Sequence, residues 1–236
     1  MKHVPAVILA GGQGTRLYPV TLETPKPLLT VKRWPIINHL IDFIRRHGVK
    51  KFHILIGKTH EPDFEWWFKR YKDHLPAELE IHTEPEPLGT FGGLKMLQSK
   101  LKSTFILTNG DELKDWDLRA QYNLHKSHHN APVATIARVK VPDPHRYGVP
   151  VMEGDIVKEF LEKPQNPPSD FINSGLYILE PEIFQYADWN KGLLMIEKDI
   201  FPRLAAEEKL VAYTSENGRW YDTGTFERWE KAIKEW

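Results

Sequence analysis

The first half of the chain alternates between two patterns of hydrophobic and polar positions. Short, continuous apolar runs predict buried β-strands, whereas apolar residues that recur every three or four positions predict amphipathic helices. The expected strands are residues 7–10, 51–56, 80–83 and 104–108. The expected helices are residues 36–44, which stop before Gly48, residues 64–71, whose aromatic face packs in the core, and residues 92–101. Repeated strand–helix units favour an α/β fold with a mostly parallel sheet flanked by helices.

The second half of the chain is richer in predicted strands. Apolar runs at residues 132–139, 148–152, 156–161 and 173–179 predict them, and several prolines between residues 164 and 168 mark a loop. No internal repeat and no long linker interrupts the chain. We therefore expect a single domain over residues 1–236, in which residues from about 1 to 130 form one part and residues from about 131 to 236 a more β-rich part.

The first predicted strand runs into a loop with three glycines, Gly11, Gly12 and Gly14. Glycine lets the backbone approach a ligand closely and point several N–H groups at one anion. Arg16 follows the loop, and Lys26 lies further along, so that two cations of different reach are available to a polyphosphate. The chain therefore carries a candidate phosphate site at the carboxyl end of a strand, where ligands of parallel sheets bind.

Two common glycine-loop motifs do not fit this segment. A P-loop ends in Gly-Lys-Ser/Thr, and no such tripeptide follows Gly14. A dinucleotide-binding fingerprint needs a third small residue, but Leu17 stands at that position. Pro19 would also disturb a helix that began at the loop. Both interpretations are therefore excluded.

Bulk composition narrows the classes of partner. Hydrophobic residues make up 41% of the chain, and 32 Lys+Arg residues balance 32 Asp+Glu residues, so the formal net charge is zero. Binders of nucleic acid or of membrane surfaces need a basic excess, so we expect neither partner. The absence of cysteine excludes disulfides and thiolate metal sites. No apolar stretch has membrane-spanning length and no signal-peptide core is present, so we expect a cytoplasmic protein.

Residues 11–21, Gly-Gly-Gln-Gly-Thr-Arg-Leu-Tyr-Pro-Val-Thr, together with Lys26-Pro27, resemble the signature of the sugar-1-phosphate nucleotidyltransferases. The resemblance implies the nucleotide-diphospho-sugar transferase fold, which is a Rossmann-like mixed, mostly parallel sheet flanked by helices with a β-rich sugar-binding lobe. It implies an enzyme that joins a nucleoside triphosphate to a sugar 1-phosphate and releases pyrophosphate, with Arg16 and Lys26 as catalytic residues. The nucleotide-binding residues that it implies are Leu9, Ala10, Gly11, Gly12, Gly14, Thr15, Arg16, Glu86, Leu88, Gly89, Thr90, Asn109, Gly110 and Asp111.

Asp111 follows a predicted strand in Asn-Gly-Asp, and Asp222 lies in Trp-x-Asp-x-Gly-Thr near the end of the chain. Each aspartate alone also fits a turn or a helix cap. Beside a phosphate loop, two carboxylates fit Mg²⁺, which prefers few carboxylates together with phosphate oxygens and water. In the family that the chain resembles, these aspartates are catalytic and hold Mg²⁺, and we expect the same here, with Mn²⁺ as a substitute. We expect His125, His128 and His129 on the solvated face of a polar helix.

Segments of the second half resemble the sugar-binding motifs of the family. Residues 160–164 resemble its Glu-Lys-Pro motif, in which the lysine binds the sugar phosphate and the glutamate binds a sugar hydroxyl. Residues 173–178 resemble its Asn-x-Gly-x-Tyr strand, whose asparagine reaches the sugar. Without the resemblance, the Glu-Lys pair also fits a surface ion pair and the asparagine fits a turn. The sugar-phosphate residues that it implies are Gly148, Glu162, Lys163, Asn173, Gly175 and Lys198.

The segment that corresponds to base selection, residues 84–93, contains Glu-Pro-Leu-Gly-Thr-x-Gly and lacks the Gln-rich pattern of thymidylyltransferases. It resembles the loop of mannose-1-phosphate and heptose-1-phosphate guanylyltransferases. We therefore expect GTP and a sugar 1-phosphate of mannose or heptose type, with uridylyl-, thymidylyl- and cytidylyltransferases of the same family as alternatives. Phe91 stands where small residues are common and is expected to reshape the base pocket.

The alternative to an enzyme is a non-catalytic regulatory subunit that binds nucleotide sugars. Such a protein is expected to lose the Arg, Lys or metal aspartates first, and all of them are present here. No hexapeptide repeat is found, so we expect no C-terminal β-helix domain. Members of the family that the chain resembles commonly form homo-oligomers, and we expect the same of this chain.

Overall fold

The computed structural model describes residues 1–236, and the chain divides into two compact units. Unit 1 comprises Met1–Pro87, Thr108–Trp116 and Arg219–Trp236. Unit 2 comprises Leu88–Leu107 and Asp117–Gly218. Each unit is therefore assembled from segments that lie far apart in the sequence.

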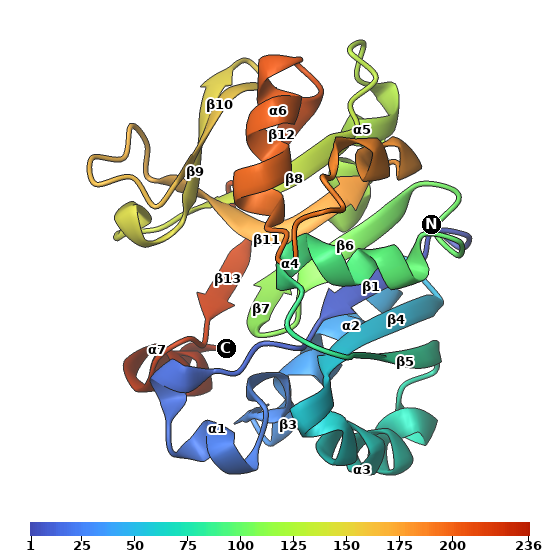
Figure 1. Cartoon of the computed structure of the whole chain (residues 1–236). Helices are drawn as coiled ribbons and strands as arrows, with labels where there is room; N and C mark the ends of the chain where they lie inside the picture. Colours follow the sequence, from blue (N-terminus) through green and yellow to red (C-terminus); the bar gives the residue numbers. More distant parts are fainter. The chain divides into compact units, whose positions relative to one another are not determined.

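The main sheet is mixed and contains nine strands in the order β5-β4-β1-β6-β11-β8-β12-β10-β9 (Figure 1). In unit 1 its strands are β1 (Ala6–Leu9), β4 (Lys51–Gly57) and β5 (Glu78–Glu84), which pair in parallel. The residues of β6 (Phe105–Asn109) are divided between the two units. The parallel strands of unit 1, with helices between them, confirm the α/β fold expected from the alternating pattern.

The long helices of unit 1 bury the apolar faces that the sequence predicts. α2 (Ile36–Arg46) ends before Gly48, whose φ of 98° is strained for residues with a side chain. α3 (Glu61–Tyr71) buries Trp67, and the Trp67 indole donates a hydrogen bond to Asn38 of α2 at 2.7 Å. The aromatic face of α3 therefore belongs to the core, as expected.

Smaller elements complete unit 1. β7 (Glu112–Asp115) pairs antiparallel with β13 (Arg219–Asp222), and β2 (Thr30–Val31) pairs antiparallel with β3 (Trp34–Pro35). The remaining helices are α1 (Val20–Glu23) and α7 (Phe226–Glu235). Single 3₁₀ turns are η1 (Thr15–Leu17), η2 (Lys26–Leu28), η3 (Lys58–His60) and η4 (Lys72–His74).

Unit 2 is rich in strands, and all the strands expected in the second half of the chain are present. They are β8 (Ala134–Lys140), β9 (Gly148–Glu153), β10 (Ile156–Glu162) and β11 (Phe171–Leu179). A fifth strand, β12 (Leu210–Thr214), was not expected from the sequence. β12 and β8 are parallel, whereas β11–β8, β10–β12 and β10–β9 are antiparallel. The helical elements are α4 (Gly89–Gly92), α5 (Leu118–Ser127), α6 (Phe201–Ala206), η5 (Gly93–Leu97), η6 (Pro144–Arg146), η7 (Pro181–Tyr186) and η8 (Ile196–Ile200).

The helix expected at residues 92–101 is wrong in its extent. α4 ends at Gly92, and a 3₁₀ turn continues only to Leu97. Glycine disfavours regular helix because its backbone loses the most conformational freedom, and this segment begins with Gly92 and Gly93. The spacing of hydrophobic residues therefore predicts which side of the segment is buried, but it does not predict whether the segment forms a regular α-helix.

The solvated position expected for His125 is also wrong. His125 is 3% exposed, and its ring contacts Thr135 Oγ1 at 2.8 Å and Glu180 Oε1 at 3.1 Å. Burial alone would raise the pKa of Glu180, but hydrogen bonds from His125, Lys126 and Thr104 outweigh it and lower that pKa to about 2. Leu118, Gln121 and His125 share the buried face of α5, which explains the difference.

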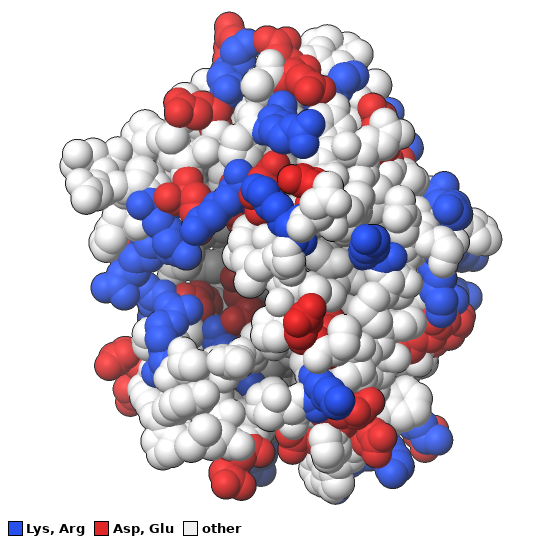
Figure 2. Space-filling model, in the orientation of Figure 1, with Lys and Arg blue, Asp and Glu red and all other residues white.

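No helix of the structure combines the length and the hydrophobicity that a membrane-crossing segment needs. On the face drawn in Figure 2, acidic and basic side chains are both spread over the surface. This mixture agrees with the equal numbers of positive and negative residues in the sequence.

Candidate active site

The glycine loop leaves the sheet at the carboxyl end of β1. Ala10 still donates to Leu55 of β4 at 2.7 Å, after which the chain departs from the sheet. Gly14 has a φ of 63°, which glycine adopts without strain, and its carbonyl accepts a hydrogen bond from Thr21 Oγ1 at 2.8 Å. Gly12 is exposed, and a Cβ placed on it would meet no atom within 4 Å. The loop thus offers open backbone in a fixed curve, as an anion-binding loop requires.

Glu84, at the end of β5, lies against this loop. A Cβ on Gly11 would lie 2.7 Å from Glu84 Oε2 and 3.2 Å from the backbone nitrogen of Gly57, so a side chain at position 11 would displace the Glu84 carboxylate and crowd β4. The Glu84 side chain is buried, and burial raises its pKa to about 7. The sequence places Glu84 only at the start of the base-selective segment and gives no sign of its contact with the loop.

We expect a Glu84→Gln variant to gain stability over the wild type as the pH rises. The pKa of Glu84 is raised from 4.5 to about 7, so the folded chain binds more protons than the unfolded chain between these values. Folding stability therefore decreases across this pH range by about 2–3 kcal/mol, and a neutral glutamine removes that decrease. Urea unfolding of both proteins at about pH 4.5 and about pH 8 measures the difference.

The exposed Glu65 supplies the matched control, Glu65→Gln, which should show no pH-dependent change relative to the wild type. A stability difference for Glu84→Gln that is the same at both pH values would contradict the interpretation of Glu84 as a buried carboxyl with a raised pKa.

Strand pairing brings the two predicted metal aspartates together. β7 and β13 run antiparallel with Asp222 opposite Glu112, which is the neighbour of Asp111. The Thr223 hydroxyl donates to the Asp111 carbonyl oxygen at 2.8 Å and ties the two segments to one another. Two carboxylates from distant segments therefore share one site because of the β7–β13 register.

The Lys26 ammonium lies between these carboxylates. Its Nζ hydrogen-bonds Asp111 Oδ2 and lies 3.7 Å from Asp222 Oδ1, and the lysine is only 6% exposed. Burial alone would lower the pKa of Lys26, but the charges of Asp111 and Asp222 outweigh it and raise that pKa above 10.5. Burial would likewise raise the pKa of Asp111, but Lys26 lowers it below its usual 3.8. Lys26 and Asp111 are therefore both charged at neutral pH.

Arg228 and the backbone of Gly224 contact the Asp222 carboxylate, and Arg16 lies close to the same glycine. Arg228, in the first turn of α7, pairs with Asp222 Oδ2, and the Gly224 N–H donates to Oδ1 at 2.6 Å. A Cβ on Gly224 would lie 3.2 Å from Arg16 Nη2, so glycine at this position leaves room for Arg16. Arg16, Lys26, Asp111 and Asp222, the four predicted catalytic residues, therefore all lie in unit 1. Arg228 belongs to no motif, and only the start of α7 places it here.

A further acid–base pair lies next to the aspartates. Lys114 is fully buried, and its Nζ lies 2.7 Å from Glu112 Oε2 and donates to Thr108 Oγ1 at 3.0 Å. Burial raises the pKa of Glu112 to about 6, against the opposing charge of Lys114. The predicted Asn109 donates its side-chain amide to Glu112 Oε1 at 3.4 Å. Asn109 thus orients an acid beside the two aspartates that are predicted to hold a metal ion.

The donor set of Asp111 and Asp222 fits a magnesium ion. Mg²⁺ accepts carboxylate oxygens together with phosphate oxygens and water. A protein cation, Lys26, lies between the two carboxylates, which shows that this point favours positive charge. The Asp111 side chain is 35% exposed and is therefore within reach of an ion from solvent.

In unit 2, predicted sugar-phosphate residues meet where β9 pairs with β10. Glu162 lies opposite Gly148, and a Cβ on Gly148 would lie 2.5 Å from the Phe160 ring and 3.2 Å from Glu162 Oε2. Lys163 follows with a φ of 52°, which is uncommon for a residue with a side chain. Its Nζ is exposed and lies 3.0 Å from Glu162 Oε1. Backbone strain at an exposed cation is typical of ligand-binding positions.

Asn173 and Gly175 occupy an irregularity in β11. The β11–β8 register shifts between Asn173 and Tyr177, and Gly175 has a φ of 66°. The Gly175 N–H donates to Asn173 Oδ1 at 3.2 Å, and Asn173 Nδ2 donates to the Tyr177 hydroxyl at 2.9 Å. Bulges of this kind re-aim side chains beside functional sites.

In the segment that is expected to select the base, residues 84–93, the structure explains why particular residue types are present. Gly89 has a φ of 84°, and a Cβ there would lie 2.3 Å from the Leu194 carbonyl oxygen. Thr90 Oγ1 donates to Glu197 Oε2 at 2.6 Å and accepts from the Ile196 N–H at 3.0 Å. Phe91 is fully buried and stacks on Trp189 at 5.9 Å between ring centroids. The Phe91 side chain therefore fills the core of unit 2 and does not line an exposed base pocket.

Glu197 is a candidate site residue that the sequence did not indicate. Burial raises its pKa, and the Glu162 and Lys163 charges act on it with opposite signs. The predicted Lys198 beside it is exposed. Both residues lie in the single π-helical turn η8, and the sequence alone does not show which of them turns inward.

The other predicted nucleotide-binding residues are divided between the units. Gly110 donates to Leu9 O at 2.9 Å, and a Cβ on Gly110 would lie 2.7 Å from that oxygen, so glycine is required for this approach. Leu9, Ala10, Thr15, Asn109, Gly110 and the exposed Glu86 lie in unit 1, and Leu88 lies in unit 2.

The model of a family described as "Nucleotidyl transferase" matches residues 5–236. The chain belongs to this nucleotidyl transferase family. A mannose-1-phosphate guanylyltransferase of Mycobacterium tuberculosis is 37% identical over 228 residues, which cover 94% of this chain and 62% of that relative. A mannose-1-phosphate guanyltransferase of Kluyveromyces lactis is 36% identical over 224 residues, which cover 92% of this chain and 60% of the relative. The chain thus spans less than two thirds of the length of these relatives.

Solved structures of similar fold support the assignment. One is described as a putative glucose-1-phosphate thymidylyltransferase from Bacillus anthracis in complex with a sucrose, with a TM-score of 0.88, 25% identity and coverage of 98% and 94% of the two chains. Another is HddC from Yersinia pseudotuberculosis complexed with GMP-PN, with a TM-score of 0.80, 26% identity and coverage of 98% and 99%. The nucleotide-diphospho-sugar transferase fold expected from the motifs is therefore confirmed.

Proposed function

We propose that the chain transfers a guanylyl group from GTP to a sugar 1-phosphate of mannose or heptose type and releases pyrophosphate. The observation that carries this proposal is the Lys26 ammonium between the Asp111 and Asp222 carboxylates in the unit that bears the glycine loop. Such a cluster suits a reaction between phosphate groups, because it combines protein cations with ligands for a divalent ion. The guanylyltransferase names of the two relatives support the choice of base and sugar.

In the proposed reaction, an oxygen of the sugar phosphate attacks the α-phosphorus of the triphosphate in line with the leaving pyrophosphate. The new P–O bond forms as the bond between the α-phosphorus and its bridging oxygen breaks. The attacking phosphate is already an anion, so no strong general base is needed. The protein therefore has to position two anions that repel one another and to neutralise charge in the transition state.

The residues of unit 1 divide these tasks. We assign the backbone N–H groups of residues 11–15 to the phosphates, Arg16 to the β- and γ-phosphates and Lys26 to the α-phosphate. Asp111 and Asp222 would hold Mg²⁺, or Mn²⁺ as a substitute, which supplies positive charge to the phosphates when bound. In unit 2, we assign Lys163 to the sugar phosphate and Glu162 and Asn173 to sugar hydroxyls, since these side chains are held at a strained turn and a bulge.

Pyrophosphate release tests the function directly. ATP, GTP, CTP, UTP and dTTP are each combined with mannose, heptose, glucose and amino-sugar 1-phosphates in the presence of Mg²⁺. We expect the highest kcat/KM for GTP with mannose or heptose 1-phosphate. A higher value with UTP, dTTP or CTP would instead support the uridylyl-, thymidylyl- or cytidylyltransferase alternative. Nucleotide-sugar binding without turnover for any pair would support a regulatory subunit.

We expect Lys163→Ala to weaken the use of sugar phosphate. Loss of a charge-assisted hydrogen bond costs about 1.5–3 kcal/mol, which corresponds to an increase of about 10- to 100-fold in the KM for the sugar 1-phosphate. The KM for the triphosphate should stay within about twofold in steady-state assays. Lys140→Ala, at an exposed lysine of unit 2, is the control. An unchanged sugar-phosphate KM would contradict the role of Lys163.

Other expectations stay predictions. They are a cytoplasmic location, a homo-oligomer and the absence of a nucleic-acid partner.

A further inference from the structure

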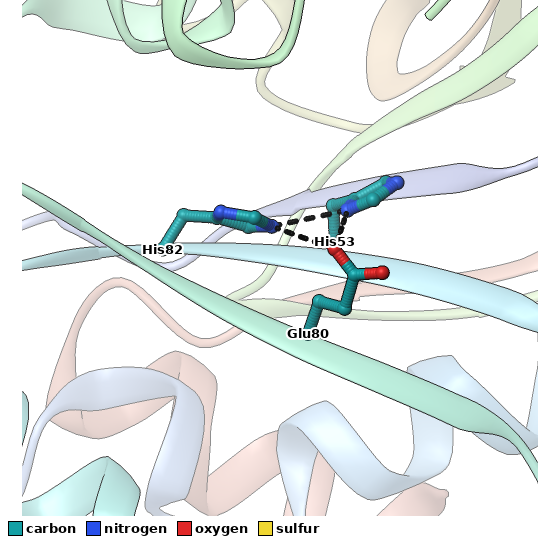
Figure 3. A group of neighbouring side chains, drawn as sticks. All are labelled: His53, Glu80 and His82. Carbon is teal, nitrogen blue, oxygen red and sulfur yellow. Dashed lines mark hydrogen bonds and ion pairs between the residues drawn. The ribbon is translucent and has the colours of Figure 1, made fainter. Parts of the chain in front are cut away.

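Three side chains on β4 and β5 converge on one point away from the glycine loop. His53 Nδ1 lies 3.0 Å from His82 Nε2 and 3.3 Å from Glu80 Oε2. His82 Nε2 and Glu80 Oε2 lie 3.6 Å apart. Figure 3 shows the two imidazole rings and the carboxylate directed toward one another. Each side chain offers one atom to the same small volume.

The register of the parallel strands creates this arrangement. His53 of β4 lies opposite Glu80 of β5, and His82 follows Glu80 by two residues. Side chains two residues apart on a strand point to the same face of the sheet, so the three groups share one face. β5 ends the order of the main sheet, which places the cluster at its edge.

The separations agree with ligation of a tetrahedral metal ion. Ligands at about 2.0–2.1 Å from Zn²⁺ lie about 3.3–3.4 Å apart in a tetrahedron. The three measured separations, 3.0, 3.3 and 3.6 Å, bracket this spacing. Two histidines and one glutamate are a common protein ligand set for zinc, with a fourth position left for water.

Burial and neighbouring contacts also suit a metal ion. The His53 side chain is 1% exposed, whereas those of His82 and Glu80 are 17% and 28% exposed, so an ion and a water have access from the latter side. Lys51 Nζ holds the other carboxylate oxygen, Glu80 Oε1, at 2.8 Å. A second contact of this kind fixes the orientation of a ligating carboxylate and leaves Oε2 directed at the histidines.

We propose that His53, Glu80 and His82 form a binding site for a divalent cation of the zinc class, distinct from the Asp111–Asp222 pair. The ion joins the edge strand β5 to β4. The carboxyl end of the same strand carries Glu84, which packs against Gly11 of the glycine loop, so the ion stabilises the strand that supports this contact. The proposal does not depend on the proposed transferase activity.

The test uses the full chain without an affinity tag, freed of metal by a chelator. Co²⁺ is the spectroscopic probe, because four-coordinate Co²⁺ with nitrogen ligands absorbs strongly in the visible range, whereas a six-coordinate oxygen site absorbs weakly. Zn²⁺ affinity is measured by competition with Co²⁺. The Asp111→Asn/Asp222→Asn variant serves as a second background, in which the candidate magnesium ligands are removed.

We expect one equivalent of Co²⁺ with a four-coordinate spectrum in both backgrounds, and a rise in Tm on addition of Zn²⁺. His82→Gln and Glu80→Gln should each reduce the Zn²⁺ affinity at least about tenfold and abolish the rise in Tm. His129→Gln is the control, because His129 stacks on His128 and has no place in the cluster, and it should bind as the wild type does.

Several results would overturn the proposal. They are the absence of stoichiometric binding by the wild type, a six-coordinate spectrum that disappears in the Asp111→Asn/Asp222→Asn background, and equal Zn²⁺ affinity in the cluster variants and the His129→Gln control. Far-UV circular dichroism of the metal-free variants shows whether they are folded. If His82→Gln is unfolded, Glu80→Gln decides the outcome, because Glu80 is the more exposed group and its amide keeps the shape of the side chain.

Discussion

Asp222→Asn and Asp111→Asn are each expected to reduce kcat about 100- to 1000-fold in the presence of saturating Mg²⁺. A divalent ion supplies several kcal/mol of charge stabilisation to a phosphoryl-transfer transition state, and an amide is a poor ligand for Mg²⁺. The change keeps the shape of each side chain, so the fold should survive. Steady-state pyrophosphate release, followed over a series of Mg²⁺ concentrations, measures both kcat and the metal requirement.

The control for this prediction lies on the same strand pair. Asp115, at the end of β7, pairs with Arg46 at 3.5 Å, and Asp115→Asn should leave kcat within about twofold of the wild type. Rates near the wild-type value for both Asp111→Asn and Asp222→Asn, with circular dichroism unchanged, would show that these carboxylates do not hold the catalytic ion.

Lys26→Met is expected to affect both turnover and stability. Loss of a phosphate-binding cation should reduce kcat/KM for the triphosphate about 100-fold or more. Removal of the ammonium also leaves two carboxylates without their shared cation. We expect the free energy of unfolding to fall by about 2 kcal/mol, less than for a fully buried pair, because Asp111 is 35% exposed and Arg228 still pairs with Asp222.

The stability difference between Lys26→Met and the wild type should depend on pH in a defined direction. The pKa of Asp111 is lowered from 3.8 in the fold, so its contribution is present above pH 3.8 and is lost as the pH falls through the lower folded value. The pKa of Lys26 is raised from 10.5, so its contribution is present below pH 10.5 and is lost at higher pH. The difference should therefore be largest between these limits and shrink outside them.

Chemical unfolding across the pH range measures this difference, and the exposed Lys50→Met is the control. A pH-independent difference, or a Lys26→Met variant with wild-type kcat/KM, would argue against a charged Lys26 that serves both the aspartates and the phosphate.

Local sequence predicts those features whose physical cause is local. Strands and helices follow from hydrophobic period, and the glycine loop follows from the freedom of glycine to curve the backbone. The prediction of a regular helix over residues 92–101 is wrong because two glycines at its start act against a correct hydrophobic spacing. The prediction that His125 is solvated is wrong because it rested on the polar neighbours of His125 in the sequence. Its position on the helix face, seven residues after Leu118, decides its burial.

The identity of the side-chain partners needs more than local pattern. The sequence assigns no role to Glu84, Arg228 or Glu197, yet each contacts a residue that the sequence singles out: Gly11, Asp222 and Thr90 respectively. The histidine–glutamate cluster is hidden in the same way. His53 and Glu80 are separated by an entire helix in the sequence and meet only through strand register.

By itself, the sequence of this chain determines an α/β nucleotidyl transferase fold and a glycine loop at the end of the first strand. It also indicates which two aspartates, which cations and which residues of the second half are expected to bind the substrates. The tertiary structure alone decides that Lys26 lies between Asp111 and Asp222, that Arg228 joins them, and that His53, Glu80 and His82 converge. The physical reason is that the period of hydrophobic residues and the positions of glycines are local properties of the chain. Contacts between strands depend instead on strand register, which only the packing of the whole fold determines.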